Sequence, residues 1–197
     1  IVNVSACDYQ LKEKFIEEFY ENSLKDDFPI VSNIEFLKGI KKEDLQKAID
    51  NRRSIRAFKK EPISKDEFLF ITKVIFEFAE KYEIEIYFIN NNIKEMKKGL
   101  YKNVKLQKEG DFKEIATKLA LNQKLSGDSS FTLFFTTKNS EEYFYLYILS
   151  GFISQILYLR STFLNISCSG LGAYFDDLSK EFLDTSNNIL YLFAIGK

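Results

Sequence analysis

Three arginines and a serine lie within one short stretch of this chain, Arg52-Arg53-Ser54-Ile55-Arg56. We call it the arginine stretch. A guanidinium is a planar, permanently charged fork that matches two phosphate oxygens at once, and a serine hydroxyl adds a neutral donor. If the stretch is extended, Arg52, Ser54 and Arg56 share one side and Arg53 faces the other. The stretch therefore predicts an anion-binding site, with an ordinary solvated basic patch as the alternative.

The sequence contains no histidine. This excludes Ser-His-Asp and Cys-His catalysis, histidine general bases and histidine-containing metal sites. The two cysteines, Cys7 and Cys168, form neither a disulfide framework nor a pair at metal-ligand spacing, so we expect no metal and a reducing, cytoplasmic setting. The chemistry must come from carboxylates, tyrosines, lysines or a bound cofactor.

The composition is that of a globular protein without a basic field. The chain has 197 residues, 45% of them hydrophobic, and a formal net charge of −1. This length fits one domain with an N-terminal extension, and the charge argues against a nucleic-acid partner. Ile1 to Asp8 lacks the basic start and apolar run of a signal peptide.

The segments on either side of the arginine stretch are predicted to be helical. A stripe of apolar residues with helical spacing predicts a helix from Asp8 to about Leu24, within an N-terminal arm of residues 1–41. A short helix, Lys42 to Asn51, delivers the arginine stretch. Ser64 and Glu67 form a capping box that opens a helix to about Tyr82.

The rest of the chain mixes strands with helices, so we expect an α+β domain with a mostly antiparallel central sheet flanked by helices. The expected strands are Glu83–Asn90, Gly99–Val104, a buried Phe131–Thr136 and a closing Ile189–Ile195. The expected helices are residues 110–123, Glu141–Asn165 and Leu178–Leu183, and the expected loops are Ser126–Ser130 and a glycine turn at Ser169–Ala173.

The predicted helix Glu141–Asn165 is the longest and is apolar around most of its circumference, so it must be buried on several sides. Its most apolar part is too short for a comfortable membrane span and carries Ser150, Gly151, Ser154 and Gln155 as one stripe. We therefore expect a buried central helix whose small residues let another helix approach closely, with a homodimer as the partner arrangement and no membrane.

The arginine stretch is followed by Phe58 and then by Pro62-Ile63. This sequence resembles the opening motif of the nitroreductase-like FMN-dependent oxidoreductases. The resemblance covers about Leu45 to Gly196, which suggests a flavin-binding domain of residues 42–197. Within this family the chain looks closest to the dehydrogenases that oxidise azoline rings of modified peptides. The motifs that follow that group in order are Gly99-Leu100-Tyr101, Gly110-Asp111, Leu121-Asn122-Gln123, Tyr143 with Tyr145, Gly151, Gln155 and Gly172 to Asp177.

The resemblance implies FMN as cofactor, a homodimer, and hydride transfer between flavin N5 and a small-molecule or peptide substrate. It places the FMN phosphate and ribityl chain on Arg52, Ser54 and Arg56, with Arg53 nearby. It places the flavin ring near N5 against the backbone of residues 172–174, where N–H groups stabilise a reduced, anionic flavin. The residues expected at the cofactor are Arg52, Arg53, Ser54, Arg56, Asn122, Gly172, Ala173 and Tyr174.

Two departures from the family pattern support a second hypothesis. Relatives carry a Pro-Ser-Gly-Gly-type loop after the helix that here ends near Tyr82, but this chain passes directly into a strand. Azoline dehydrogenases commonly have a Lys-Tyr pair where this chain has Thr137-Lys138-Asn139, which leaves Lys138 as the catalytic candidate. The alternative is a non-catalytic binding or scaffold subunit, and a third possibility is an unrelated α+β protein whose arginines bind another phosphate.

Overall fold

The computed structural model describes residues 37, 39–139 and 142–197. The predicted helix Asp8 to Leu24 and nearly all of the arm at residues 1–41 lie outside them. The helices are α2 Lys42–Asn51, α3 Lys65–Lys81, α4 Lys113–Leu119, α5 Lys124–Asp128, α6 Tyr143–Phe163 and α7 Asp176–Leu183. The strands are β1 Ile84–Asn90, β2 Gly99–Lys102, β3 Lys105–Glu109, β4 Phe131–Thr137, β5 Ser167–Leu171 and β6 Asn188–Gly196.

One six-stranded sheet organises the domain, in the order β3-β2-β1-β4-β6-β5. Every pairing between neighbouring strands is antiparallel, which confirms the predicted α+β fold. The predicted buried strand, β4, lies between β1 and β6, and all of its residues are buried. A continuous apolar run is typical of a strand covered on both faces, and the helices provide that cover.

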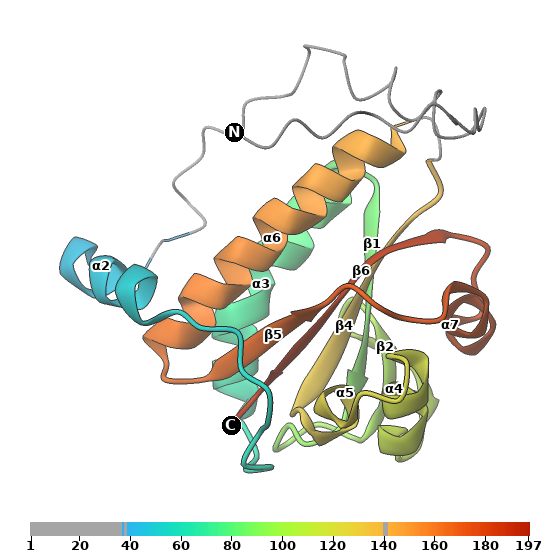
Figure 1. Cartoon of the computed structure of the whole chain (residues 1–197), viewed down its shortest axis with the longest axis horizontal. Helices are drawn as coiled ribbons and strands as arrows, with labels where there is room; N and C mark the ends of the chain where they lie inside the picture. Colours follow the sequence, from blue (N-terminus) through green and yellow to red (C-terminus); the bar gives the residue numbers. More distant parts are fainter. Residues whose placement is uncertain (1–36, 38, 140–141) are drawn as a thin grey trace, which may run out of the picture. The chain divides into compact units, whose positions relative to one another are not determined.

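Helices lie on both faces of the sheet (Figure 1). On one face, α3 packs its rings against the strands, with Phe68 5.0 Å from both Phe88 and Phe131 between ring centroids. On the other face, residues of α4 and α7 pack against Tyr87 of β1 and Phe134 of β4. Because successive strand residues point to opposite faces, Tyr87 and Phe88 serve different layers.

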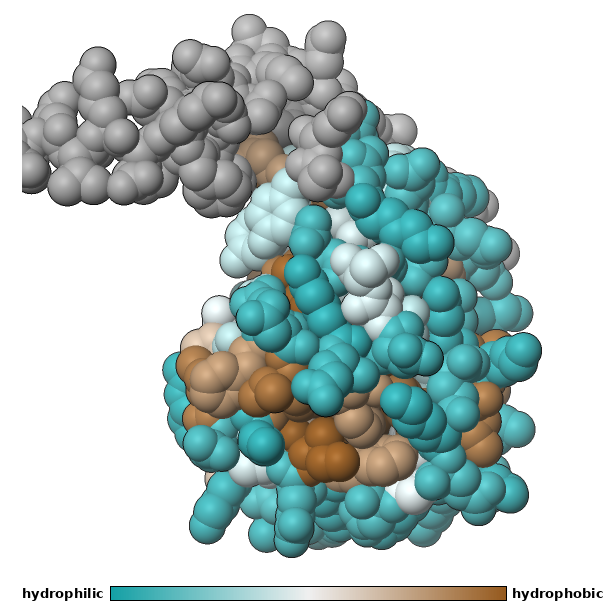
Figure 2. Space-filling view, turned by 90° about the vertical axis from the view of Figure 1, so that its right-hand side faces the viewer, coloured by the Kyte–Doolittle hydropathy of each residue, from teal (hydrophilic) through white to brown (hydrophobic). Residues whose placement is uncertain are grey.

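The α4–α7 side also carries exposed apolar surface. Figure 2 turns this side of the molecule toward the viewer, and hydrophobic residues gather on its lower half, over α4 and α7. Leu121 and Phe175 are each 40% exposed. The Phe175 N–H donates to the carbonyl of Leu119, the last residue of α4, at 2.9 Å, and Leu121 follows two residues later.

Helix α3 begins with the capping box that the sequence predicts. The Ser64 hydroxyl accepts from the Glu67 N–H at 3.1 Å, and the Glu67 carboxylate accepts from the Ser64 N–H at 2.7 Å. The other carboxylate oxygen of Glu67 lies 2.7 Å from the Lys197 ammonium. Burial raises the pKa of Glu67, but the hydrogen bonds from Lys197 and Ser64 together outweigh burial, so this pKa is lowered.

A lowered pKa means that ionised Glu67 stabilises the fold above its ordinary pKa of 4.5 and that this contribution is lost as the pH falls. We expect Glu67→Gln to lower the free energy of unfolding at pH 7 by about 1 kcal/mol, with the difference from the parent closing below about pH 4. Urea unfolding from pH 3 to 7 measures this. Glu77→Gln, on the exposed side of α3, is the matched control, and an equal loss in both variants would refute the assignment.

Helix α6 confirms the predicted long, largely buried helix. Ten of its residues are buried, and Tyr147 and Ile148 are each 44% exposed. Within the described part of the chain, none of the helices combines the length and apolar character needed to cross a membrane. The domain therefore covers α6 on most sides and leaves one strip of it open.

The predicted glycine turn at Ser169–Ala173 is wrong, because Ser167–Leu171 forms strand β5. This strand pairs with β6 from Ser167 opposite Gly196 to Leu171 opposite Leu192. Gly170 is needed as a residue without a side chain, since a Cβ there would lie only 2.9 Å from the Tyr191 ring carbon Cζ. The glycine signals a close approach inside a strand rather than a reversal of the chain.

Two further local predictions are wrong. The expected helix at residues 110–123 is only α4, because Leu121 and Asn122 adopt left-handed φ angles of 52° and 60° and end it. The expected loop at Ser126–Ser130 instead begins inside α5. Strand β3 was not predicted, because its sequence Lys-Leu-Gln-Lys-Glu has little apolar alternation; pairing with β2 makes it a strand.

Candidate functional site

The arginine stretch leaves the end of α2 and runs beside β5, the edge strand of the sheet (Figure 1). Ser54 forms an isolated parallel bridge with Cys168 of β5. The Ile55 N–H donates to the Cys168 carbonyl at 3.3 Å. These contacts are local to the edge, so the rest of β5 keeps one side free of strand pairing.

Tyr158 of α6 joins the arginine stretch to the strand. Its hydroxyl lies 2.7 Å from the Ser54 hydroxyl and accepts from the Gly170 N–H at 3.0 Å. The Arg52 guanidinium carbon lies 4.8 Å from the centre of the Tyr158 ring, a distance suited to a cation–π contact. Sequence reasoning missed Tyr158, because 104 positions separate it from Ser54 and no local pattern connects them.

The three arginines have different surroundings. Arg53 turns back onto α2, where its Nη1 donates to the Asp50 carbonyl at 2.8 Å and to the Arg52 carbonyl at 2.7 Å. Arg52 is half-buried over Tyr158, whereas Arg56 is exposed. The structure thus brings Arg52 and Ser54 together at the edge of β5 and directs Arg53 elsewhere.

The free edge of β5 offers backbone groups to a ligand. In an extended strand, alternate residues direct their N–H and C=O groups to the same edge. The Cys168 carbonyl and the Gly170 N–H already point outward, to Ile55 and Tyr158. Gly172 follows in the same alternation and is exposed, so its backbone is open to a ligand at this edge.

The turn between α4 and α5 lies at the far end of this edge. The Gln123 side-chain amide donates to the Ala173 carbonyl at 3.3 Å, which places its exposed neighbour Asn122 near residues 172–173. The Tyr174 hydroxyl points inward and donates to the Leu190 carbonyl at 3.0 Å. Burial raises the pKa of Tyr174 strongly, so the phenol stays protonated and anchors the strand end.

A pocket of about 300 Å³ opens between α6 and β6 next to this edge. Its aromatic walls are tyrosines and its α6 side carries the small residues that the sequence marked as a stripe. Its lining consists of Tyr147, Ser150, Gly151, Ser154, Gln155, Tyr158 and Tyr191. Tyr158 therefore belongs both to the wall of this pocket and to the arginine end of the β5 edge.

Lys138 is not brought to the arginine stretch. It follows β4, whose last residue Thr137 pairs with Asn188, whereas Cys168 lies level with the other end of β6. Its side chain is 78% exposed, and its ammonium lies 3.9 Å from Glu85. Among residues 37, 39–139 and 142–197 no group of His, Cys, Asp and Glu is arranged to hold a metal ion.

Comparison with known families gives one match over most of the chain. The model of the Nitroreductase family matches residues 49–197. This range begins just before the arginine stretch and includes β1 to β6. Among curated protein sequences, none matches this chain.

Solved structures share the fold at low sequence identity. A protein of Anabaena variabilis assigned as a nitroreductase aligns with a TM-score of 0.69 and 22% identity, over 79% of this chain and 38% of that one. The nitroreductase NfrA1 of Bacillus subtilis aligns with a TM-score of 0.60 and 16% identity, over 77% and 65%. A protein of Desulfovibrio desulfuricans assigned as a nitroreductase, solved in complex with FMN, aligns with a TM-score of 0.58 and 13% identity. The alignment covers 77% of this chain and 84% of that one. The chain thus spans less than two thirds of the length of the first two structures.

Proposed function

The chain belongs to the nitroreductase family, and from that premise we propose that it is an FMN-dependent oxidoreductase that moves a hydride between a substrate and flavin N5. The observation that carries the proposal is the joined arrangement of Arg52, Ser54, Tyr158 and Gly170 at the free edge of β5. It combines side chains that can donate hydrogen bonds to a phosphate with an open strand edge. A structure with the same fold contains FMN, which adds support.

The residues at this edge suit the parts of FMN. Arg52, Ser54 and Arg56 would hold the phosphate and ribityl chain, since guanidinium and hydroxyl donors match phosphate oxygens. Arg53 would add only long-range charge, because its guanidinium donates to the carbonyls of Asp50 and Arg52. A Cβ at Gly172 would find no atom closer than Tyr191 at 4.0 Å, so the strand end is open to a flat ring.

The backbone around Gly172 and Ala173 would face the flavin ring, with the Gly172 N–H directed to the open edge. FMN itself supplies the hydride acceptor, and the chain supplies position and charge. Gly172 lies four residue steps beyond Cys168, a span of roughly 13 Å between the phosphate end and the ring end at about 3.3 Å per step. Asn122, on the turn held to Ala173 by Gln123, would add an amide to the ring end.

The finer proposal for the substrate is an azoline ring in a modified peptide. Its support is the ordered set of motifs from Gly99-Leu100-Tyr101 to Asp177. Lys138 is the proposed proton carrier, and its exposed position requires the substrate to reach the end of β4. Conversion of an azoline-containing peptide to its azole, detected as a loss of two mass units, tests this step separately from flavin reduction.

We further propose that the protein is a homodimer whose contact uses the open strip of α6. A Cβ at Gly151 would meet no atom within 4 Å, and Tyr147 and Ile148 are exposed beside it. Gly151→Arg places a charge on this strip without an internal clash, so we expect a stable monomer by light scattering. Lys118→Glu on α4 is the control surface change, and an unchanged dimer in Gly151→Arg would contradict the proposed contact.

A second candidate function is a non-catalytic binding or scaffold subunit. The observation that favours it is the direct passage from α3, which ends at Lys81, into β1, which begins at Ile84. No room remains there for the family's loop beside the flavin. A subunit of this kind would retain the fold and the dimer without turnover.

An absorption spectrum of the purified full chain, after addition of FMN and removal of free flavin, tests the proposed function. Retained flavin bands that bleach with NADH or NADPH and recover with an electron acceptor are the expected result. Retained flavin without turnover would favour the scaffold subunit. A colourless protein would refute the FMN-dependent function.

A further inference from the structure

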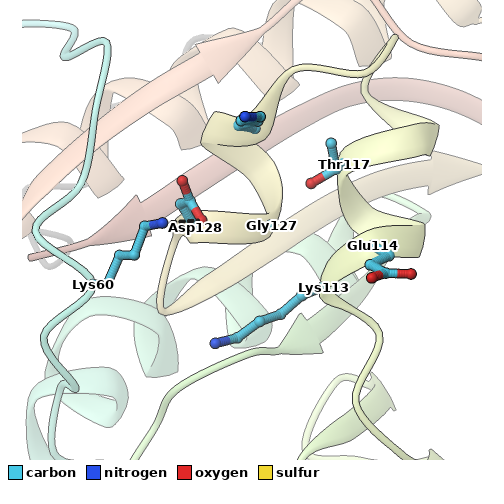
Figure 3. Close-up of a pocket in the computed structure, with 7 residues that line it drawn as sticks. Lys60, Lys113, Glu114, Thr117, Gly127 and Asp128 are labelled. Carbon is cyan, nitrogen blue, oxygen red and sulfur yellow. Dashed lines mark ion pairs between the residues drawn. The ribbon is translucent and has the colours of Figure 1, made fainter.

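A second pocket, of about 380 Å³, lies beyond the arginine stretch, between Lys60 and the helices α4 and α5 (Figure 3). We call it the lysine pocket. Its lining consists of Lys60, Lys113, Glu114, Thr117, Lys124, Gly127 and Asp128. None of these residues contributes to the β5 edge or to the α6 pocket.

Positive charge in the lysine pocket exceeds what its carboxylates neutralise. Lys60 is paired with Asp128 at 3.0 Å, but Lys113 and Lys124 form no ion pair within the part of the chain that the structure describes. Glu114 points away from Lys60 and Lys113 in Figure 3. Two ammonium groups are therefore available to an anion.

The walls of the pocket are held rigidly by the contact between α4 and α5. Gly127 is buried, and a Cβ there would clash with the Thr117 hydroxyl and the Lys113 carbonyl. This close approach places the Thr117 hydroxyl beside α5 and keeps the start of Lys113 next to it (Figure 3). The Thr117 hydroxyl is therefore fixed in place, which reduces the entropy lost when it binds a ligand, whereas Lys113 is fixed only at its backbone.

We propose that the lysine pocket binds a phosphate group, either as the free ion or as part of a small molecule. Ammonium groups and a hydroxyl are donors that phosphate oxygens accept. The volume exceeds that of a lone phosphate and lies in the range of small-molecule sites, so the pocket has room for an attached group. The shared chemistry comes either from free phosphate or from the 2′-phosphate that distinguishes NADPH from NADH.

Calorimetric titration of the full chain with inorganic phosphate tests the site. Lys113→Gln with Lys124→Gln is expected to weaken phosphate binding about tenfold, because two charge pairs with partly exposed lysines are lost. Lys105→Gln with Lys118→Gln removes the same charge at exposed positions outside the pocket and is expected to change the dissociation constant less than twofold. Equal weakening in both double variants, or no binding to the parent, would overturn the proposal.

Two further titrations identify the source of the phosphate. If NADPH is the ligand, it binds the parent more tightly than NADH does, and Lys113→Gln with Lys124→Gln abolishes that preference. If free phosphate is the ligand, the double variant weakens phosphate alone. Thr117→Val keeps the side-chain shape and is expected to weaken phosphate binding about threefold. An unchanged affinity would show that the Thr117 hydroxyl does not contact the phosphate.

The flavin spectrum separates this proposal from the FMN-dependent function. Lys113→Gln with Lys124→Gln is expected to retain FMN, because the proposed FMN phosphate donors lie in the arginine stretch. Loss of flavin in that double variant would show that the lysine pocket is part of the FMN site and would overturn the separate phosphate site. A parent that binds no FMN, but whose phosphate binding is weakened by Lys113→Gln with Lys124→Gln, would uphold the lysine pocket while refuting the FMN function.

Discussion

Protein carrying Arg52→Ala together with Arg56→Ala is expected to emerge from purification without flavin. Each charge-assisted hydrogen bond to a phosphate contributes about 1.5–3 kcal/mol. Loss of two such donors therefore weakens FMN binding by roughly 10²- to 10⁴-fold. The dissociation constant, measured from the change in flavin fluorescence on titration, gives the size of the effect.

Arg53→Ala is the matched control for this experiment. The Arg53 guanidinium donates to two carbonyls, those of Asp50 and Arg52, rather than pointing along β5. We expect Arg53→Ala to weaken FMN binding less than threefold, because it removes only a distant charge. If Arg53→Ala weakens FMN binding as much as the double variant does, the phosphate lies on the other side of the arginine stretch and the proposed site is wrong.

Gly170→Ala is expected to lower the free energy of unfolding by about 1–3 kcal/mol, because it forces a methyl group into an occupied space. An added Cβ would clash with the Tyr191 hydroxyl and would lie 2.9 Å and 3.0 Å from the ring carbons Cζ and Cε1. Relief requires movement of the Tyr191 ring or of β5. Either movement also disturbs the Gly170 N–H bond to Tyr158, so weaker FMN binding is expected as well.

Two comparisons make the cause of this loss clear. In a Tyr191→Ala background, Gly170→Ala is expected to lower the free energy of unfolding by less than about 0.5 kcal/mol, because the clashing ring is gone. Gly172→Ala, two residues along the same edge, meets only Tyr191 at 4.0 Å and is expected to leave the free energy of unfolding nearly unchanged. If Gly170→Ala remains equally destabilising without the Tyr191 ring, strain in the strand and not the clash is responsible.

Sequence patterns predicted the elements whose signals are local. The capping box at Ser64 and Glu67 marked the start of α3, and strands β1 and β4 lie within one residue of their predicted ranges. The antiparallel α+β class followed from their mixture and is confirmed. The arginine stretch was recognisable because the charge and the hydroxyl that an anion requires lie within five neighbouring residues.

Elements that depend on distant partners were missed for a physical reason. Gly170 reads as a turn residue by itself, and only the Tyr191 ring beside it and the pairing with β6 make it part of a strand. Strand β3 exists because β2 completes its hydrogen bonds. The short helix α5 packs closely against α4 at Gly127, a contact that its own sequence does not reveal.

The sequence by itself therefore determined the class of fold, the helix that leads into the arginines and the donors that suit a phosphate. Only the tertiary structure decided which of those donors act together. It turned Arg53 back onto α2, held Ser54 against Tyr158 across 104 positions, and left the edge of β5 open at Gly172. Side-chain type is a property of one residue, whereas a binding site requires several residues at fixed distances, and those distances arise when the sheet and its helices pack together.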